Sequence, residues 1–285
     1  LTSVDNKAGN VYFLDAPGGT GKTFVMNLLL AKVRNSNKTA IAVASSGISA
    51  TLLQGGRTAH SALKIPSNMQ ISEPLTCNIT KQSNIAAVFR SMDLLVWDEA
   101  TMSIKLRFEA VDSLFRDIRN NDKPFGGVTV LFSGDFRQTL PVIPRGTRAD
   151  EINSCSKKSY LWKYITVLKL RKNMRVQLSD QKDATNFSDD LLRIGNGTVP
   201  EEDGEMKISE TLGTRCSNID QCLNNVYGDL KNIHTKSVSW LMERAILSLK
   251  NTTTHDINSS IIENFPKILG VVDGLALWVL PSLAP

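Results

Sequence analysis

The stretch that decides the fold is Val11-Tyr12-Phe13-Leu14-Asp15-Ala16-Pro17-Gly18-Gly19-Thr20-Gly21-Lys22-Thr23. Its first four residues form an apolar, aromatic-rich run that is typical of a buried strand. The glycines permit backbone angles that turn successive N–H groups inward as an anion-binding nest. An apolar helix follows from Lys22, and its N-terminus faces the same point. The stretch therefore predicts a P-loop, a phosphate-binding turn between a strand and a helix.

This turn departs from the strict G-x-x-x-x-G-K-[ST] pattern at its first position, where Ala16 replaces glycine. Alanine is tolerated there if its φ is negative. We expect Lys22 to reach the β- and γ-phosphates of a nucleoside triphosphate, and the Thr23 hydroxyl to bind Mg²⁺. A chance glycine loop is the alternative, but the flanking strand and helix disfavour it. The residues predicted to bind the nucleotide are Ala16, Gly18, Gly19, Thr20, Gly21, Lys22 and Thr23.

A second apolar run, residues 94–97, leads directly into Asp98-Glu99. A P-loop enzyme needs an acid at this place to hold Mg²⁺, and hydrolysis needs a base that orients the attacking water. We assign Asp98 to the metal and Glu99 to the water. Taken alone, an apolar run followed by two acids is most often an ordinary strand end, so this assignment depends on the P-loop.

A third apolar run, residues 128–132, leads into the polar stretch Ser133-Gly134-Asp135-Phe136-Arg137-Gln138-Thr139-Leu140-Pro141-Val142. Polar groups at the end of such a strand lie where open α/β sheets bind ligands. Gln138 is a candidate sensor of the γ-phosphate. Asp135 and Arg137 are candidates for contact with metal, phosphate or a partner domain. A polar turn closed by the proline is the alternative.

Apolar runs and helical patterns alternate along the first half of the chain, which predicts an α/β fold with a parallel sheet. The expected strands are residues 11–14, 39–44, 94–97 and 128–132, and the expected helices are residues 23–33 and 103–118.

The prolines and glycine of residues 141–147 predict a linker, after which residues 166–170 resemble the first strand of a second domain. We therefore divide the chain into residues 1–145 and 146–285. Residues 61–88 lack clear periodicity and are interpreted as an inserted loop or small subdomain. Further expected elements are a helix at 183–194 that ends at Gly195, a loop-rich stretch at 197–235 and a helix at 238–249.

The composition is that of an ordinary globular protein, with 285 residues, 41% hydrophobic and 21% charged. The net charge of +5 and the pI near 9.0 suit a polyanionic partner without requiring one. Four cysteines lack the paired spacing of a zinc site, so we expect reduced thiols and an intracellular protein. Residues 268–280 are apolar but too short to span a membrane.

The ordered motifs resemble those of one family, the petite-integration-frequency (PIF-type) 5′→3′ DNA helicases of superfamily one, especially forms related to Helitron transposons. The similarity covers about residues 10–200 and rests on several motifs together. They are the P-loop, Ala44-Ser45-Ser46-Gly47-Ile48-Ser49-Ala50, Gly56-Arg57-Thr58-Ala59-His60-Ser61, the Asp98-Glu99 strand, the stretch 134–142 and Asn173-Met174-Arg175.

The resemblance implies a motor with two RecA-like domains, ATP and Mg²⁺ in the cleft between them, and single-stranded DNA crossing both. Gln138 would couple the nucleotide to DNA, and Arg175, from the second domain, would act as an arginine finger. Residues 61–88 would act as a strand-separating wedge, with a surface loop as the alternative. The residues that would touch DNA are Ser45, Ser46, Gly47, Thr58 and His60.

Each of these assignments has a structural alternative. The serines around Gly47 read equally well as a helix N-cap. His60 could be a satisfied polar residue at a strand end, and Arg175 could be one solvated arginine of a basic run. The family pattern favours the functional interpretation in each case.

The resemblance also implies DNA repair, recombination or telomere maintenance, a monomer acting on single-stranded DNA and duplex junctions, and a nuclear or mitochondrial location. We expect a fragment, because two C-terminal family motifs and an upstream adenine-recognising glutamine segment are not found in the sequence. The second domain would then be incomplete. A truncated, non-unwinding nucleotide-dependent DNA-binding module is the alternative function, and a different P-loop class, such as a small-molecule kinase or an assembly ATPase, is a third.

Overall fold

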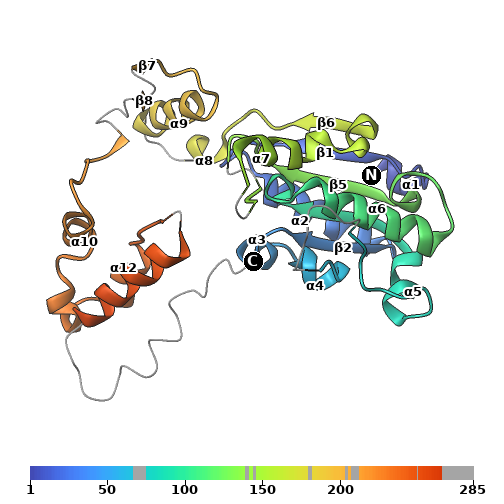
Figure 1. The fold of residues 1–285 in the computed structure, drawn as a ribbon, viewed down its shortest axis with the longest axis horizontal. Coiled ribbons are helices and arrows are strands. Elements are labelled where there is room, and N and C mark those ends of the chain that lie inside the picture. Colours follow the sequence, from blue (N-terminus) through green and yellow to red (C-terminus); the bar gives the residue numbers. More distant parts are fainter. Residues whose placement is uncertain are drawn as a thin grey trace. The chain divides into compact units, whose positions relative to one another are not determined.

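A computed structural model describes residues 1–66, 75–138, 141–143, 146–178, 182–202, 205–206, 212–248 and 250–264. The chain divides into two compact units, Leu1–Pro200 and Glu201–Pro285, and each is described by itself (Figure 1).

Unit 1 is built on a six-stranded sheet in which every strand pair is parallel, with the order β3-β2-β4-β5-β1-β6. All four predicted strands are present. The strands are β1 (Val11–Asp15), β2 (Thr39–Ala44), β3 (Arg57–Thr58), β4 (Met92–Asp98), β5 (Thr129–Gly134) and β6 (Ile165–Lys169). The predicted α/β class with a parallel sheet is confirmed.

Helices connect the strands and cover both faces of the sheet (Figure 1). The helices of unit 1 are α1 (Thr2–Asp5), α2 (Lys22–Asn35), α3 (Gly47–Leu52), α4 (Ala59–Leu63), α5 (Asn84–Arg90), α6 (Lys105–Arg119), α7 (Arg148–Ser154), α8 (Met174–Gln177) and α9 (Lys182–Gly195). Short 3₁₀ turns lie at η1 (Ala100–Met102), η2 (Pro124–Gly127), η3 (Ser156–Lys158) and η4 (Tyr160–Tyr164).

Alternation along each strand separates the two apolar layers, because successive strand side chains point to opposite faces. On β4, Leu94 and Val96 pack with α2, whereas Leu95 and Trp97 pack with α4, α5 and α6. Both faces of the strand are buried, as its continuous apolar run predicts.

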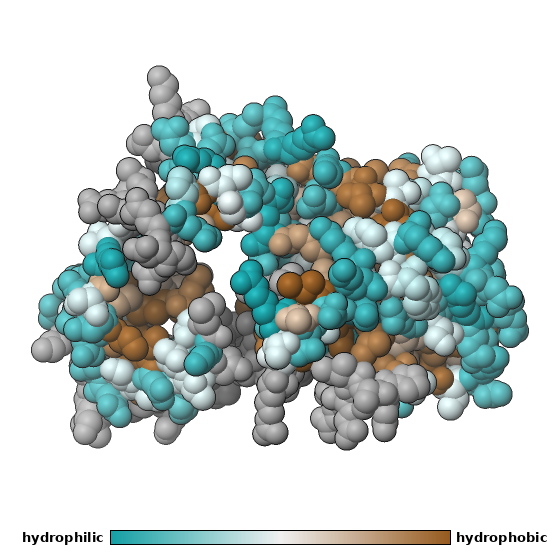
Figure 2. All heavy atoms as spheres, turned by 45° about the horizontal axis from the view of Figure 1, so that its top comes forward, coloured by the Kyte–Doolittle hydropathy of each residue, from teal (hydrophilic) through white to brown (hydrophobic). Residues whose placement is uncertain are grey.

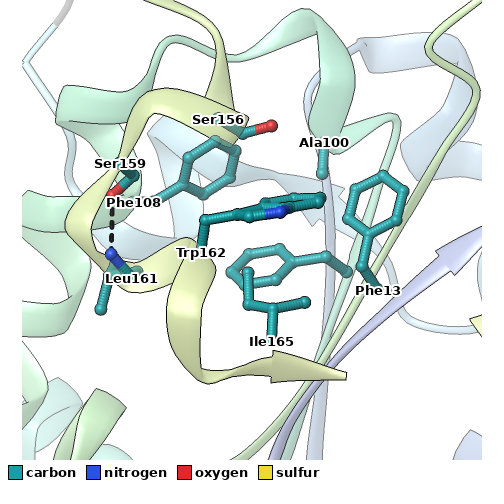
Figure 3. Close-up of a pocket in the computed structure, with 9 residues that line it drawn as sticks. Phe13, Ala100, Phe108, Ser156, Ser159, Leu161, Trp162 and Ile165 are labelled. Atoms are coloured by element: carbon teal, nitrogen blue, oxygen red, sulfur yellow. Dashed lines mark hydrogen bonds between the residues drawn. The ribbon is translucent and has the colours of Figure 1, made fainter. Parts of the chain in front are cut away.

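Strand β6 corrects the predicted division of the chain. Residues 166–170 were expected to begin a second domain, but β6 pairs with β1 as the edge strand of the same sheet, with Ile165 opposite Val11. Trp162, just before β6, lies beside Phe13 with ring centroids 5.5 Å apart (Figure 3). Unit 1 therefore continues past residue 145, to Pro200. That the remaining chain belongs to a partial second RecA-like domain stays a prediction.

Residues 61–88 contain the end of α4 and the start of α5, and residues 67–74 lie outside the described chain. Between these helices, the side chains of Leu75, Cys77 and Ile79 pack against the apolar core beneath α6. The wedge function of residues 61–88 stays a prediction.

Unit 2 contains β7 (Glu201–Glu202), β8 (Glu205–Met206), η6 (Leu230–Thr235) and the helices α10 (Ile219–Tyr227), α11 (Val238–Met242) and α12 (Asn251–Glu263). Large apolar side chains stay exposed, among them Val238, Met242 and Leu247, and apolar residues gather on its surface in Figure 2. Among its described residues, only Leu230 and Ile257 are buried apolar side chains.

Two sequence predictions in unit 2 were wrong. The stretch expected to be loop-rich contains α10, whose N-terminus is capped by Asn218. The helix expected at 238–249 ends at Met242. Arg244 provides the physical reason, because its guanidinium stacks 4.2 Å from the Trp240 ring centroid and donates to the Trp240 carbonyl, which stabilises the end of the helix. Among the described residues, no helix is long and apolar enough to cross a bilayer, and residues 268–280 lie outside them.

Asp112 on α6 is a buried carboxylate that joins three segments of unit 1. Its Oδ1 accepts from the Phe125 N–H at 2.6 Å, and its Oδ2 accepts from the Tyr160 hydroxyl at 2.7 Å. Arg116 Nε lies 2.8 Å from Oδ2. Burial, and then the hydrogen bond to Asp112, raises the pKa of Tyr160, so this hydroxyl remains a donor in alkaline solution as well.

We expect Asp112→Ala to lower the free energy of unfolding by about 3 kcal/mol, because it leaves the buried Phe125 N–H without its acceptor and the Arg116 guanidinium without its ion-pair partner. Asp117→Ala is the matched control on the same helix, since its exposed pair with Lys81 should contribute less than about 1 kcal/mol. Denaturant titration of both variants measures the difference, and equal losses would contradict the proposed role of the buried carboxylate.

Candidate nucleotide site and nucleic-acid face

The backbone of the P-loop has the shape of a phosphate cradle. Gly19 and Gly21 have φ angles of +82° and +83°, a conformation that favours glycine. The Thr20 hydroxyl donates to the Pro17 carbonyl at 2.7 Å and braces the turn from inside. No side chain caps the start of α2, and its first turn holds no acid. Its terminal N–H groups are therefore available to an anion.

Ala16 occupies the position where the strict motif has glycine. It is fully buried, its N–H donates to the Gly134 carbonyl at 3.2 Å, and its φ is not positive. The condition for tolerating alanine, a φ that is not positive, is therefore met because the backbone here continues the strand, and the contact of Ala16 with a nucleotide stays a prediction.

Lys22 brings the P-loop and the acidic strand end together. Its Nζ lies 2.8 Å from Glu99 Oε1 and 3.6 Å from Asp98 Oδ1. The three side chains are 12%, 15% and 3% exposed in that order. One cation between two shielded carboxylates leaves this corner with a net negative charge, which attracts a further cation.

Asp98 is held by donors that the sequence prediction missed. Its Oδ1 accepts from the Ser133 hydroxyl at 2.5 Å and from the Glu99 N–H at 2.8 Å. Ser133 lies near the end of β5, the neighbouring strand, and a lone serine in that apolar run was the available signal. The aspartate therefore has one fixed orientation before any ligand arrives.

Glu99 combines an unusual backbone with an unpaired oxygen. Its φ is +49°, which is rare for a residue with a side chain and is found often at functional sites. Its Oε2 is enclosed by protein without a hydrogen-bond partner. An enclosed acceptor without a donor is well suited to bind a water molecule.

The donor set fits a magnesium nucleotide. Thr23 follows Lys22 in the first turn of α2, and its hydroxyl makes no hydrogen bond within the described chain. Among the described residues no group of three His, Cys, Asp or Glu side chains could hold a metal alone. Magnesium is commonly held by one or two protein oxygens with phosphate and water oxygens. One hydroxyl and one carboxylate fit that requirement.

The end of β5 carries Asp135, Arg137 and Gln138 beside the cradle. Arg137 Nη1 lies 2.9 Å from Asp135 Oδ1 and 3.8 Å from Asp15 Oδ1, and its Nε donates to Asn196 at 2.8 Å. Gln138 is exposed, and its backbone N–H donates to the Asp135 carbonyl at 3.1 Å. Its role as a sensor stays a prediction.

Arg175 lies at the start of α8 within unit 1, although it was expected from a second domain. Its N–H donates to the Gly19 carbonyl at 3.1 Å, so its backbone touches the cradle. Its role as a finger stays a prediction.

The residues predicted to touch DNA lie at the carboxyl ends of β2 and β3. Ser46 caps α3 by accepting from the Ser49 N–H, so the capping alternative is correct for this side chain. Ser45 Oγ accepts from Trp97 Nε1 at 3.0 Å and keeps its own hydrogen free to donate. A Cβ built on Gly47 would meet no atom within 4 Å, so open space adjoins this backbone.

Thr58 caps α4 by accepting from the Ser61 N–H at 3.4 Å. His60 is not a satisfied polar residue, because its Nε2 is enclosed without a hydrogen-bond partner. Burial, and then the charge of Arg107, lowers the pKa of His60 below its usual value, so the ring is neutral at pH 7. These side chains thus lie on one edge of the sheet, and their contact with DNA stays a prediction.

Two further hollows are not the nucleotide site. An apolar gap of about 10 Å³ lies beneath Trp162 and Phe13, and it is large enough for one water molecule at most (Figure 3). A polar cavity of about 130 Å³ lies near Met92 and Thr129, at the amino ends of β4 and β5, opposite the edge that carries Asp98.

Comparison with known proteins identifies the family of the chain. The sequence model of the family described as PIF1-like helicase matches residues 1–205. This chain belongs to the PIF1-like helicase family. The fold of unit 1 is accordingly that of a P-loop, RecA-like domain, as the sequence predicted.

Individual relatives agree with this assignment. The ATP-dependent DNA helicase Pif1 of Psychrobacter sp. is 28% identical over 186 residues, which cover 65% of this chain and 28% of that protein. The ATP-dependent DNA helicase RRM3 of Saccharomyces cerevisiae is 30% identical over 162 residues, covering 56% and 22% respectively. The crystal structure of Bacteroides Pif1 bound to ssDNA matches with 25% identity and a TM-score of 0.55, covering 68% of this chain and 45% of that one. This PIF1-like chain thus spans about a quarter of the length of these two curated relatives.

We expect Gly19→Ala to weaken ATP binding at least tenfold. A Cβ at this position would lie 2.5 Å from Asn173 Oδ1, and the positive φ adds a strain of about 1–2 kcal/mol for a residue with a side chain. Calorimetric titration with Mg²⁺ and ATP measures the change. Asn35→Ala, at the exposed far end of α2, is the control. Unchanged affinity in the Gly19 variant would show that the turn adapts and that its conformation is not required.

Proposed function

We propose that this chain carries the ATP-hydrolysing part of a 5′→3′ DNA helicase. The observation that supports this most is the contact of Lys22 with both Asp98 and Glu99 at the mouth of the cradle. A cation, a metal ligand and a base then converge where a triphosphate would end. The names of the relatives, ATP-dependent DNA helicases, support the same function.

We assign one role to each functional side chain at the mouth of the cradle. Lys22 would leave Glu99 for the β- and γ-phosphates, which frees the carboxylate to orient a water molecule. Thr23 and Asp98 would hold Mg²⁺, and Ser133 would keep Asp98 in place. Bound MgATP supplies the reactive phosphoryl group, and Glu99 accepts a proton from the attacking water.

Gln138 and Arg175 complete the proposed catalytic set. Gln138 would sense the γ-phosphate from the end of β5, and Arg175 would stabilise the charge of the transferred group. Such an arginine finger typically raises turnover by about 10³–10⁵.

The nucleic-acid partner is proposed to be single-stranded DNA and its junctions with duplex. The edge that carries Ser45, Gly47 and His60 would face the phosphate backbone, and the net charge of +5 favours this contact. The similarity to the crystal structure of Bacteroides Pif1 bound to ssDNA supports the proposal. We further propose a monomer that acts in DNA repair, recombination or telomere maintenance, in the nucleus or the mitochondrion.

A second candidate function is a nucleotide-dependent DNA-binding module that does not unwind duplex. Unwinding of a tailed duplex by the purified chain would exclude it.

We expect Glu99→Gln to retain ATP binding and to lower turnover by about 10²–10⁴, because glutamine keeps the shape of the side chain but cannot accept the proton. Steady-state phosphate release and ATP titration together measure both quantities. Asp122→Asn, an exposed loop residue, is the charge-matched control. Turnover in the glutamine variant equal to that of the unmodified chain would exclude Glu99 as the base.

We also expect single-stranded DNA to stimulate turnover at low salt, with an affinity that falls steeply between about 50 and 200 mM salt as counterion release weakens. Phosphate release with and without a single-stranded oligonucleotide tests this. No stimulation at low salt would contradict the proposed DNA partner.

A further inference from the structure

Asn173 lies between the P-loop and the helices that follow β6. It caps α8, because its Oδ1 accepts from the N–H groups of Arg175 at 3.1 Å and Val176 at 3.2 Å. Its Nδ2 donates to the Ser188 hydroxyl of α9 at 2.8 Å. One carboxamide therefore uses both its oxygen and its nitrogen to join α8 to α9.

The same carboxamide fits against the cradle. The space that a Cβ on Gly19 would fill is taken by Asn173, whose Oδ1 lies 2.5 Å from the built position. The Arg175 N–H is shared between Asn173 Oδ1 and the Gly19 carbonyl, each 3.1 Å away. The turn that carries Arg175 thus touches the P-loop through backbone and side chain together.

A second contact fixes the other end of α9. Arg137 Nε donates to Asn196 Oδ1 at 2.8 Å, just beyond the helix. A Cβ on Gly195 would lie 3.1 Å from Arg137 Cβ, so the helix end packs closely on this arginine. Arg137 is itself held by Asp135 at the end of β5. The segment 173–196 is therefore attached to the carboxyl edge of the sheet at both of its ends.

We propose that Asn173 is a positioning residue that sets Arg175 against the nucleotide cradle, supported through α9 by Ser188 and by the contact between Arg137 and Asn196. This inference rests on the function proposed above, in which Arg175 contacts the transferred phosphate. The Arg175 side chain is exposed and has no ion pair within the described chain. The hydrogen bonds of its backbone therefore determine the position from which the side chain extends. A displacement of about 1 Å at such a group can cost about 10²-fold in rate.

The test compares turnover and binding in the full chain. Asn173→Ala should lower DNA-stimulated kcat by about 10²-fold, with little change in ATP affinity. Asn173→Ser should recover part of this loss, because serine keeps the cap but loses the contact with Ser188. Ser188→Ala should give a smaller loss than Asn173→Ala. Asn186→Ala, an exposed residue of the same helix, should behave as the unmodified chain.

A double variant separates positioning from stability. If Asn173 acts through Arg175, adding Asn173→Ala to Arg175→Ala should leave kcat unchanged, because the affected group is already absent. A further fall in the double variant would overturn the inference. The inference would also be overturned if a lower melting temperature and a weaker ATP affinity fully accounted for the loss of turnover in Asn173→Ala.

Hydrogen exchange provides a readout without turnover. The amides of α8 should exchange faster in Asn173→Ala than in Asn186→Ala, and unchanged exchange would overturn the inference. Failure of the proposed function is recognised separately: in that case Arg175→Ala would keep the turnover of the unmodified chain, whatever Asn173 does.

Discussion

The arrangement of the site depends on one electrostatic contact, the Lys22 ammonium between the carboxylates of Asp98 and Glu99. The lysine begins the helix after β1, Asp98 ends β4 and Glu99 follows it, so the contact forms only if both strands stop at the same edge of the sheet. Strand β5 lies between them and supplies Ser133, which fixes Asp98. The order of the strands in the sheet therefore determines which side chains meet at the site.

The apolar core is the support that keeps this edge in register. Side chains of alternate parity on β1 and β4 enter opposite layers, and a slip by one residue would exchange the two layers. Such a slip would also turn Asp98 away from Ser133. The burial of Trp97 and Val96 on opposite faces thus also fixes the orientation of Asp98, which follows them in the strand.

Much of the sheet and of the nucleotide corner could be predicted from the sequence, because apolar runs define buried strands and the P-loop carries its own backbone requirements. The partner of β6 could not be predicted. Four of its five residues are exposed, as in an edge strand. Which edge of the sheet it joins depends on tertiary packing, which the local sequence does not encode. The contacts of Ser133 and Asn173 were also missed, since hydrogen bonds between side chains distant in sequence leave no periodic signal. The helix at 238–249 was overestimated because propensity does not register the stacking of Arg244 on Trp240.

The place of β6 has a mechanical consequence. Lys169 lies opposite Asp15, and only residues 170–172 separate that strand end from the cap of α8. Four extended steps of backbone reach at most about 14 Å. The turn that carries Arg175 is therefore joined by a short connection to β6, which lies next to β1, the strand that leads into the P-loop. Because this connection is short, the start of α8 stays within that distance of the end of β6 even when the contacts of Asn173 are removed.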